Sequence, residues 1–141
     1  MELMDSIFLD TNVLLDYLAA RKPFDQAAEQ IMQRVLNGQI ELFISTLSVC
    51  NISYILRKIA PGSNIPQTLA DLTAMASLTP IDQHVILAAL DQPFKDFEDA
   101  VQYSSAFSVG KITHIITRNT VDFSYSQIPV MTPEDYLALN P

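Results

Sequence analysis

Aspartates stand at three places where the chain is expected to leave regular structure. Asp10 directly follows the apolar run IFL, Asp99 lies in the acidic stretch KDFEDA, and Asp122 lies in TRNTVDF. Carboxylate oxygens are the ligands that Mg²⁺ and Mn²⁺ prefer in proteins, and an ion held by them can activate water for attack on a phosphate. Three acids on three separate elements therefore have the chemistry of a metal-dependent hydrolase, provided that the fold brings them together.

Each of these acids also has a purely structural interpretation. An Asp after a strand often caps the next helix, and Asp10 is placed to do so. Acids in a first turn, such as Asp96 and Asp99, are favoured by the helix dipole alone. Turns favour Asn119 and Asp122 in the same way. Convergence of the acids on one edge of a sheet is what separates a metal site from a set of caps and turns.

The stretch around Asp99 predicts how its acids are oriented. Asp96 and Asp99 are three residues apart, so they share one side of a helix. We expect Phe97 and Ala100 to anchor this helix to the sheet and Glu98 to point elsewhere. Asp96 and Asp99 are therefore the two acids of this stretch that the sequence predicts at the site.

The apolar pattern predicts strands that alternate with helices. The strands are expected at 6–9, 40–45, 78–81, 113–117 and 128–132, and the helices at 13–20, 25–36, 46–58, 67–76, 82–90 and 97–107. This order is typical of an α/β protein, and we predict a single domain over 1–141, built as a three-layer α/β/α sandwich around a central, mostly parallel sheet of four to five strands. Functional groups gather beyond the carboxyl ends of such strands.

Composition limits the possible partners. The chain has 141 residues, of which 49% are hydrophobic and 17% charged, with a formal net charge of -8. This charge excludes a protein that holds nucleic acid simply through a basic surface, although divalent cations on a carboxylate cluster can supply an attractive face. The apolar runs are shorter than the roughly 18 residues of a membrane span, and the start MELMD lacks a basic flank. We predict a cytoplasmic protein without membrane contact.

Four motifs, taken in order, resemble the PIN domain family. They are DTNVLLDYL, STLSVCNISYILRK, EDAVQYSSA and ITRNTVDFSYSQIPVMTPEDYL. They are similar to the small bacterial PIN proteins, which include toxin-like ribonucleases, over nearly the whole chain. The resemblance implies a metal-dependent endoribonuclease that uses Mg²⁺ or Mn²⁺, acts on RNA as the toxin of a toxin–antitoxin pair, has an antitoxin as protein partner and forms a homodimer.

The resemblance also implies roles for particular residues. Asp10 is the first metal ligand, Asp99 is the acid of the later helix, and Asp122 or Asn119 contributes after the following strand. Asp96 is an additional ligand. Polar contacts with the substrate are implied for Thr11, Asn12 and Thr117. The charge and position of Arg118, beside Asn119, separately predict a contact with a phosphate.

One position departs from the family pattern. The middle helix of the family commonly carries a Glu at its site position, and this chain has Asn51 there. An amide can coordinate through its oxygen or position a water, but it adds no charge, and site charge governs divalent-ion affinity. Either Asp96 compensates, or the chain is a catalytically weakened PIN-fold module that binds nucleic acid or protein. A third reading makes Asp10 an aspartyl nucleophile, which commonly needs a second acid at the position of Asn12.

Overall fold

The computed structural model describes residues 4–141 as alternating strands and helices. The strands are β1 (Asp5–Leu9), β2 (Ile40–Ser45), β3 (Ser77–Thr79), β4 (His114–Ile116) and β5 (Val130–Met131). The helices are α1 (Thr11–Leu18), α2 (Asp25–Leu36), α3 (Thr46–Ile59), α4 (Ile65–Met75), α5 (Gln83–Leu90), α6 (Phe97–Val109) and α7 (Pro133–Leu139), with a 3₁₀ turn η1 (Thr120–Phe123). Residues 1–3, part of the MELMD stretch, lie outside the described residues.

The five strands form one parallel sheet in the order β3-β2-β1-β4-β5. The chain begins at β1 in the centre, moves outward through β2 to β3, and then returns to place β4 on the other side of β1. Strand order therefore reverses between β1 and β4, and in α/β proteins ligands commonly bind beyond the carboxyl ends of the strands at such a reversal. Asp10 and Thr117 are the residues that directly follow these two strands.

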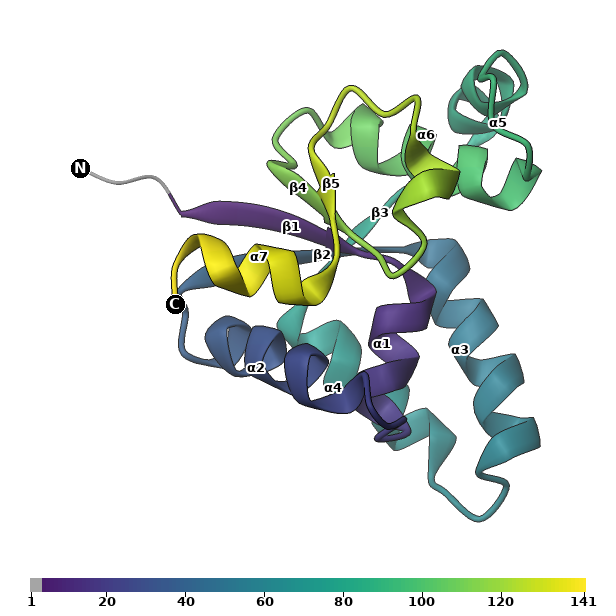
Figure 1. Cartoon of the computed structure of the whole chain (residues 1–141). Helices are drawn as coiled ribbons and strands as arrows, with labels where there is room; N and C mark the ends of the chain where they lie inside the picture. Colours follow the sequence, from purple (N-terminus) through teal and green to yellow (C-terminus); the bar gives the residue numbers. More distant parts are fainter. Residues whose placement is uncertain (1–3) are drawn as a thin grey trace.

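Helices cover both faces of the sheet and confirm the predicted three-layer sandwich (Figure 1). On one face, Ile7 and Leu42 belong to a core shared with α1, α2, α3, α4 and α7. On the other face, Phe8 and Phe43 pack with Tyr103 of α6 and with η1. Because side chains alternate along a strand, each strand serves both cores, which explains why the sequence shows continuous apolar runs.

The differences from the predicted elements are local. Helix α7 and the turn η1 were not predicted; α7 begins at Pro133 after Thr132, whose hydroxyl accepts a hydrogen bond from the Asp135 amide. Phe97 does not anchor α6, because 48% of it is exposed. The helix ends at Gly110, whose φ of 79° is a left-handed conformation that glycine adopts without strain. None of the helices between residues 4 and 141 is long and apolar enough to cross a membrane.

Candidate functional site

Asp10 is fixed at the carboxyl end of β1 by contacts with β4 and α1. Its backbone N–H donates to the Ile116 carbonyl at 3.0 Å, its Oδ1 accepts from the Thr11 amide at 2.8 Å, and its Oδ2 accepts from the Thr117 hydroxyl at 2.8 Å. Asp10 therefore caps α1, as its structural interpretation predicts. Only 7% of the residue is exposed, and the donors are all neutral, so they stabilise the carboxylate by hydrogen bonding but supply no positive charge.

Asp99 and Asp122 line a cleft next to Asp10. The cleft lies between the start of α6 and η1, has a volume of about 380 Å³ and is also lined by Lys95, Asp96 and Tyr125. Between residues 4 and 141, no hydrogen bond reaches the side chain of Asp99 or Asp122. Their oxygens are thus free to bind a ligand in the cleft.

The pKa values show how closely these acids interact. The pKa of Asp99 is raised to about 7, mainly by burial and then by the charges of four neighbouring acids, in the order Asp10, Asp96, Asp122 and Glu98. Burial also raises the pKa of Asp10; hydrogen bonds from Thr117 and Thr11 oppose this shift, and the charges of Glu98 and Asp122 add to it. The acids therefore form one electrostatic unit in which each charge disfavours the others.

No ion pair engages these acids in the part of the chain that the structure describes, and Lys95, which lines the same cleft, lies outside ion-pair distance of them. The ion pairs found there involve Asp5, Asp16 and Glu41, and none of them involves Asp10, Asp99, Asp122 or Glu98. Closely spaced carboxylates without a countercharge are costly unless a cation or a proton is added. The arrangement therefore favours a bound cation.

Glu98 points toward the site, and the prediction that it points elsewhere was wrong. Its Oε1 accepts a hydrogen bond of 2.6 Å from Nδ2 of Asn51 on α3. Asp96, by contrast, caps α6, since its Oδ1 accepts from the amides of Glu98 at 2.8 Å and Asp99 at 3.4 Å. The start of α6 thus brings Glu98 and Asp99 to the site region, and Asp96 caps the helix that carries them.

A buried polar network lies beneath the acids. The hydroxyls of Thr11 on α1 and Ser48 on α3 are 2.8 Å apart, and both accept from Nε2 of Gln102 on α6, at 3.3 and 3.0 Å. Gln102 is 1% exposed, and its Oε1 has no hydrogen-bond partner among the described residues. Thr11 was predicted at the mouth of the site, and the structure places its hydroxyl in this floor.

The other predicted substrate contacts lie on the β4 side of the site. The Asn12 amide is 3.4 Å from both Asp10 Oδ2 and the Thr117 hydroxyl. Asn119 donates its backbone N–H to that same hydroxyl at 3.1 Å and starts η1. Arg118 is paired with Asp16 and not with the acids of the site, since its Nε donates to Oδ2 of Asp16 at 2.7 Å.

The donor set fits a hard divalent cation. All candidate ligands are carboxylate or amide oxygens, and Gln102, on the same helix as Asp99, adds a buried oxygen without a hydrogen-bond partner among the described residues. As the side chains stand, no three His, Cys, Asp or Glu residues within 4–141 lie close enough together to enclose an ion. Mg²⁺ does not require such a cage, because it keeps several waters and is usually bound through one or two carboxylates.

The sequence matches the family model of the PIN domain over residues 6–121. The chain belongs to the PIN domain family. Among its relatives, Ribonuclease VapC1 of Aquifex aeolicus (strain VF5) is 25% identical over 140 residues, which cover 94% of this chain and 93% of the relative.

Two solved structures share this PIN fold over most of their length. In a toxin–antitoxin complex from Klebsiella pneumoniae, one chain is 25% identical with a TM-score of 0.66, and the match covers 90% of this chain and 97% of that one. VapBC2 from Rickettsia felis, bound to a DNA fragment from its promoter, has a TM-score of 0.64 at 11% identity, with coverage of 89% and 96%. The second likeness concerns the fold alone.

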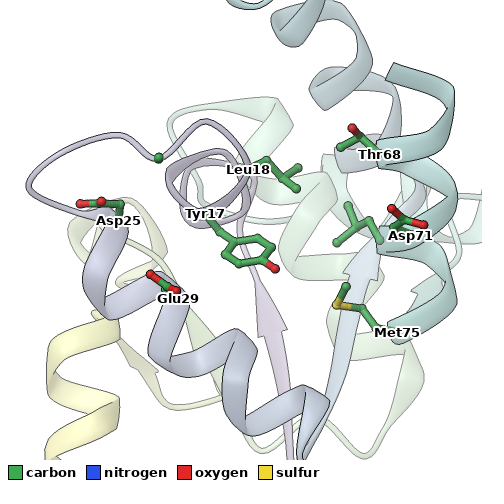
Figure 2. A pocket seen from close by; sticks show the side chains of 9 residues that line it. Tyr17, Leu18, Asp25, Glu29, Thr68, Asp71 and Met75 are labelled. Carbon is green, nitrogen blue, oxygen red and sulfur yellow. The ribbon is translucent and has the colours of Figure 1, made fainter. Parts of the chain in front are cut away.

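The PIN domain has a second acidic cavity, between α1, α2 and α4 (Figure 2). We call it the acidic groove. Tyr17, Leu72 and Met75 form its apolar part, and Asp25, Glu29 and Asp71 its charged part. No Lys or Arg is among the residues that line it. The acidic groove is therefore suited to a partner that combines positive charge with apolar side chains.

Proposed function

We propose that this PIN domain is a metal-dependent endoribonuclease that hydrolyses RNA phosphodiester bonds with Mg²⁺ or Mn²⁺, and that it acts as the toxin of a toxin–antitoxin pair. The observation that carries the proposal is that Asp10, Asp99 and Asp122 act on one another electrostatically near the reversal of strand order, and that none of them forms an ion pair among the described residues. The names of its relatives, a ribonuclease VapC1 and a toxin–antitoxin complex, support the same reaction class and setting.

In this proposal Asp10, Asp99 and Asp122 hold the ion, with Asp96 adding negative charge beside them. When bound, the ion supplies acidification of a water and stabilisation of charge on the phosphate. Thr117 and the Thr11 amide orient Asp10 through their hydrogen bonds, which keeps one carboxylate in a fixed position on a rigid sheet edge.

The amides and the cleft would bind the RNA. The side-chain amides of Asn12 and Asn51 donate to Asp10 and Glu98, and Asn119 follows β4 with its backbone on Thr117. Amides of this kind can donate to phosphate oxygens or orient a water. Arg118 lies at the same strand end, and the 28% of its side chain that is exposed leaves room for a phosphate contact next to its ion pair.

Tyr125 is proposed as a base-stacking residue. It lines the cleft with Asp99, Asp122 and Lys95, and 60% of it is exposed. Stacking on an aromatic ring contributes about 1 to 3 kcal/mol per base. We expect Tyr125→Ala to weaken the binding of single-stranded RNA by about tenfold, measured by fluorescence anisotropy in Ca²⁺ to prevent cleavage. Binding equal to that of the wild type would remove Tyr125 from the RNA path.

The acidic groove is proposed as the contact for an antitoxin. A basic segment with interspersed apolar side chains complements Asp25, Glu29 and Asp71 around the apolar part of the groove. Reversal of charge with Glu29→Lys should weaken capture of the antitoxin and leave RNA cleavage by the isolated PIN domain unchanged. We also propose a homodimer in the cytoplasm, and light scattering of the purified chain tests the dimer.

The alternative is a PIN-fold binding module with weakened catalysis, which Asn51 favours because it removes one carboxylate of the family pattern. The two proposals are separated by cleavage of a labelled RNA with Mg²⁺ or Mn²⁺, by the wild type, Asp10→Asn, Asp99→Asn and Asn51→Glu. If the protein is a nuclease, the wild type cleaves the RNA and both Asp variants do not. An inactive wild type, together with cleavage by Asn51→Glu, would favour the binding module. Cleavage by both Asp variants at the wild-type rate would contradict the roles assigned to Asp10 and Asp99.

A further inference from the structure

Residue 51, where the family pattern has a Glu, is in contact with a carboxylate from another helix. Asn51 on α3 donates its Nδ2 hydrogen to Oε1 of Glu98 on α6 at 2.6 Å. A Glu at position 51 would place two carboxylates in contact here, and like charges at that distance repel. The amide at 51 and the acid at 98 are therefore complementary, whereas the acid of the family pattern at 51 conflicts with Glu98.

We propose that Glu98 supplies the metal-binding carboxylate that residue 51 lacks, and that Asn51 positions it. This inference rests on the proposed function, since it concerns the same metal site. The Asn51 hydrogen bond occupies Oε1, and Oε2 has no partner in the part of the chain that the structure describes. The Asn51 contact thus fixes one oxygen of this exposed carboxylate and leaves the other available to a cation.

A second observation, the orphaned oxygen of Gln102, points to a ligand on this side of α6. Gln102 follows Asp99 by three residues and Glu98 by four, so the three side chains share one side of the helix. Its amide nitrogen is bonded to Thr11, next to Asp10, and to Ser48, one turn before Asn51. Its Oε1 is buried without a donor. A buried acceptor of this kind requires a partner such as ordered water, and a water of an ion held by the neighbouring acids would supply one.

Asp96 is less suited to replace the lost acid. Its Oδ1 already accepts from the amides of Glu98 and Asp99, so it has a defined role at the start of α6. That role is independent of any cation, because it satisfies backbone donors that every helix start leaves free. Asp96 thus orders the turn that carries Glu98 and Asp99, and Glu98 is the acid that contacts the site residue on α3.

The test is the affinity for Mn²⁺ measured by calorimetry on the metal-free protein, without RNA. Glu98→Gln should weaken binding by about tenfold or more, the range found when groups around a metal are removed. Asp96→Asn, which keeps a good capping residue, should weaken it less. Glu134→Gln is the matched control, because Glu134 is an exposed Glu in the first turn of α7 and its loss changes the net charge equally. We expect this control to bind Mn²⁺ as the wild type does.

A second variant moves the carboxylate from position 98 to position 51. The double variant Asn51→Glu with Glu98→Gln exchanges the amide and the acid across the same hydrogen bond, and it should recover most of the affinity that Glu98→Gln loses. Thermal unfolding of each metal-free variant verifies that it is folded. A double variant as weak as the single Glu98→Gln overturns the exchange of roles between the two positions.

The remaining outcomes separate the inference from the proposed function. Wild-type affinity in Glu98→Gln, together with lost binding in Asp10→Asn, overturns the role of Glu98 and leaves the metal site intact. A greater loss in Asp96→Asn than in Glu98→Gln also overturns it, in favour of Asp96. A wild type that binds no Mn²⁺ overturns the proposed metal-dependent function itself.

Discussion

Two buried aspartates lie six residues apart along α1, and the fold treats them in opposite ways. Asp16 is 1% exposed and is held by Nε of Arg21 at 3.0 Å and by Nε of Arg118 at 2.7 Å. Asp10 is 7% exposed and receives hydrogen bonds only from neutral groups of Thr11, Asn12 and Thr117. Asp16 is therefore a countercharged structural acid, and Asp10 is an acid whose countercharge the described chain does not supply.

This difference shows how a functional carboxylate can be recognised from a structure. A buried charge is tolerated when it is paired and hydrogen-bonded, which accounts for Asp16. Asp10 lies instead beside Glu98 and Asp122, whose charges oppose its ionisation. A buried charge without a countercharge at a sheet edge favours the binding of a cation. Substitution of Asp10 should therefore affect metal binding and cleavage, whereas substitution of Asp16 should affect stability.

The largest effect is expected from Asp10→Asn. Loss of a metal ligand should lower RNA cleavage by about 10³-fold, because the bound ion contributes several kcal/mol of transition-state stabilisation. The free energy of unfolding of the metal-free protein should stay equal or rise, since an uncompensated charge is removed. Cleavage rates and urea unfolding on the same preparation test both. A variant that loses stability and keeps cleavage would reverse the contrast with Asp16.

Asp16→Asn should have the opposite profile. It leaves two guanidinium groups without their partner and should lower the free energy of unfolding by about 2 kcal/mol; their partial exposure, 36% and 28%, limits the loss. The affinity for Mn²⁺ should change far less than in Asp10→Asn. Asp135→Asn, an exposed acid on α7, is the control for net charge. Stability equal to that of this control would contradict the structural role of Asp16.

The pH dependence of stability should reveal the uncompensated acids. The pKa of Asp99 is raised from 3.8 to about 7 in the folded protein, so between these values the folded state binds more protons than the unfolded state. The contribution of Asp99 is fully present below the lower value and is lost as the pH rises through the upper one. In EDTA, the wild type should therefore lose stability relative to Asp99→Asn between pH 5 and pH 8. Unfolding curves that shift in parallel would contradict this, and Mn²⁺ should restore the wild type at high pH.

The smallest effect is expected from the contact between Phe24 and Arg118, the partner of Asp16. The guanidinium of Arg118 lies 4.0 Å from the centre of the Phe24 ring, which is 36% exposed. Phe24→Leu keeps an apolar side chain and removes the ring, so it should lower the free energy of unfolding by about 0.5 to 1 kcal/mol. Cleavage should not change. A loss as large as that of Asp16→Asn would mean that the ring, not the carboxylate, holds Arg118.

Much of the fold could be predicted from the sequence because its elements have strong local signals. The bounds of α2 and β2 agree with the predicted ranges 25–36 and 40–45, since a clear 3.6-residue period ends at Asn37-Gly38 and a continuous apolar run follows. Helix α7 and η1, of seven and four residues, are too short to repeat a period. The sequence predicted a mostly parallel sheet but not the order of its strands, because no local pattern encodes which strands are neighbours.

The site could be predicted in part for a related reason. Asp10 directly follows a strand, and acids beyond parallel strands share one edge. Glu98 could not be oriented, because seven consecutive residues of α6 from Ala100 to Ala106 are buried, so no apolar stripe defines the side that faces the sheet. The role of Asp16 depends on Arg118, 102 residues away, and no local pattern predicts such a pair.

The central claim is that the acids around Asp10 are completed by a divalent cation that acts in RNA cleavage. The most direct test titrates Mn²⁺ into the metal-free wild type and Asp10→Asn by calorimetry, and then assays cleavage of a labelled RNA by the same samples. We predict saturable binding and cleavage by the wild type, and loss of both in the variant. Cleavage by a wild type that binds no Mn²⁺ or Mg²⁺, or equal binding by the two proteins, would contradict the claim.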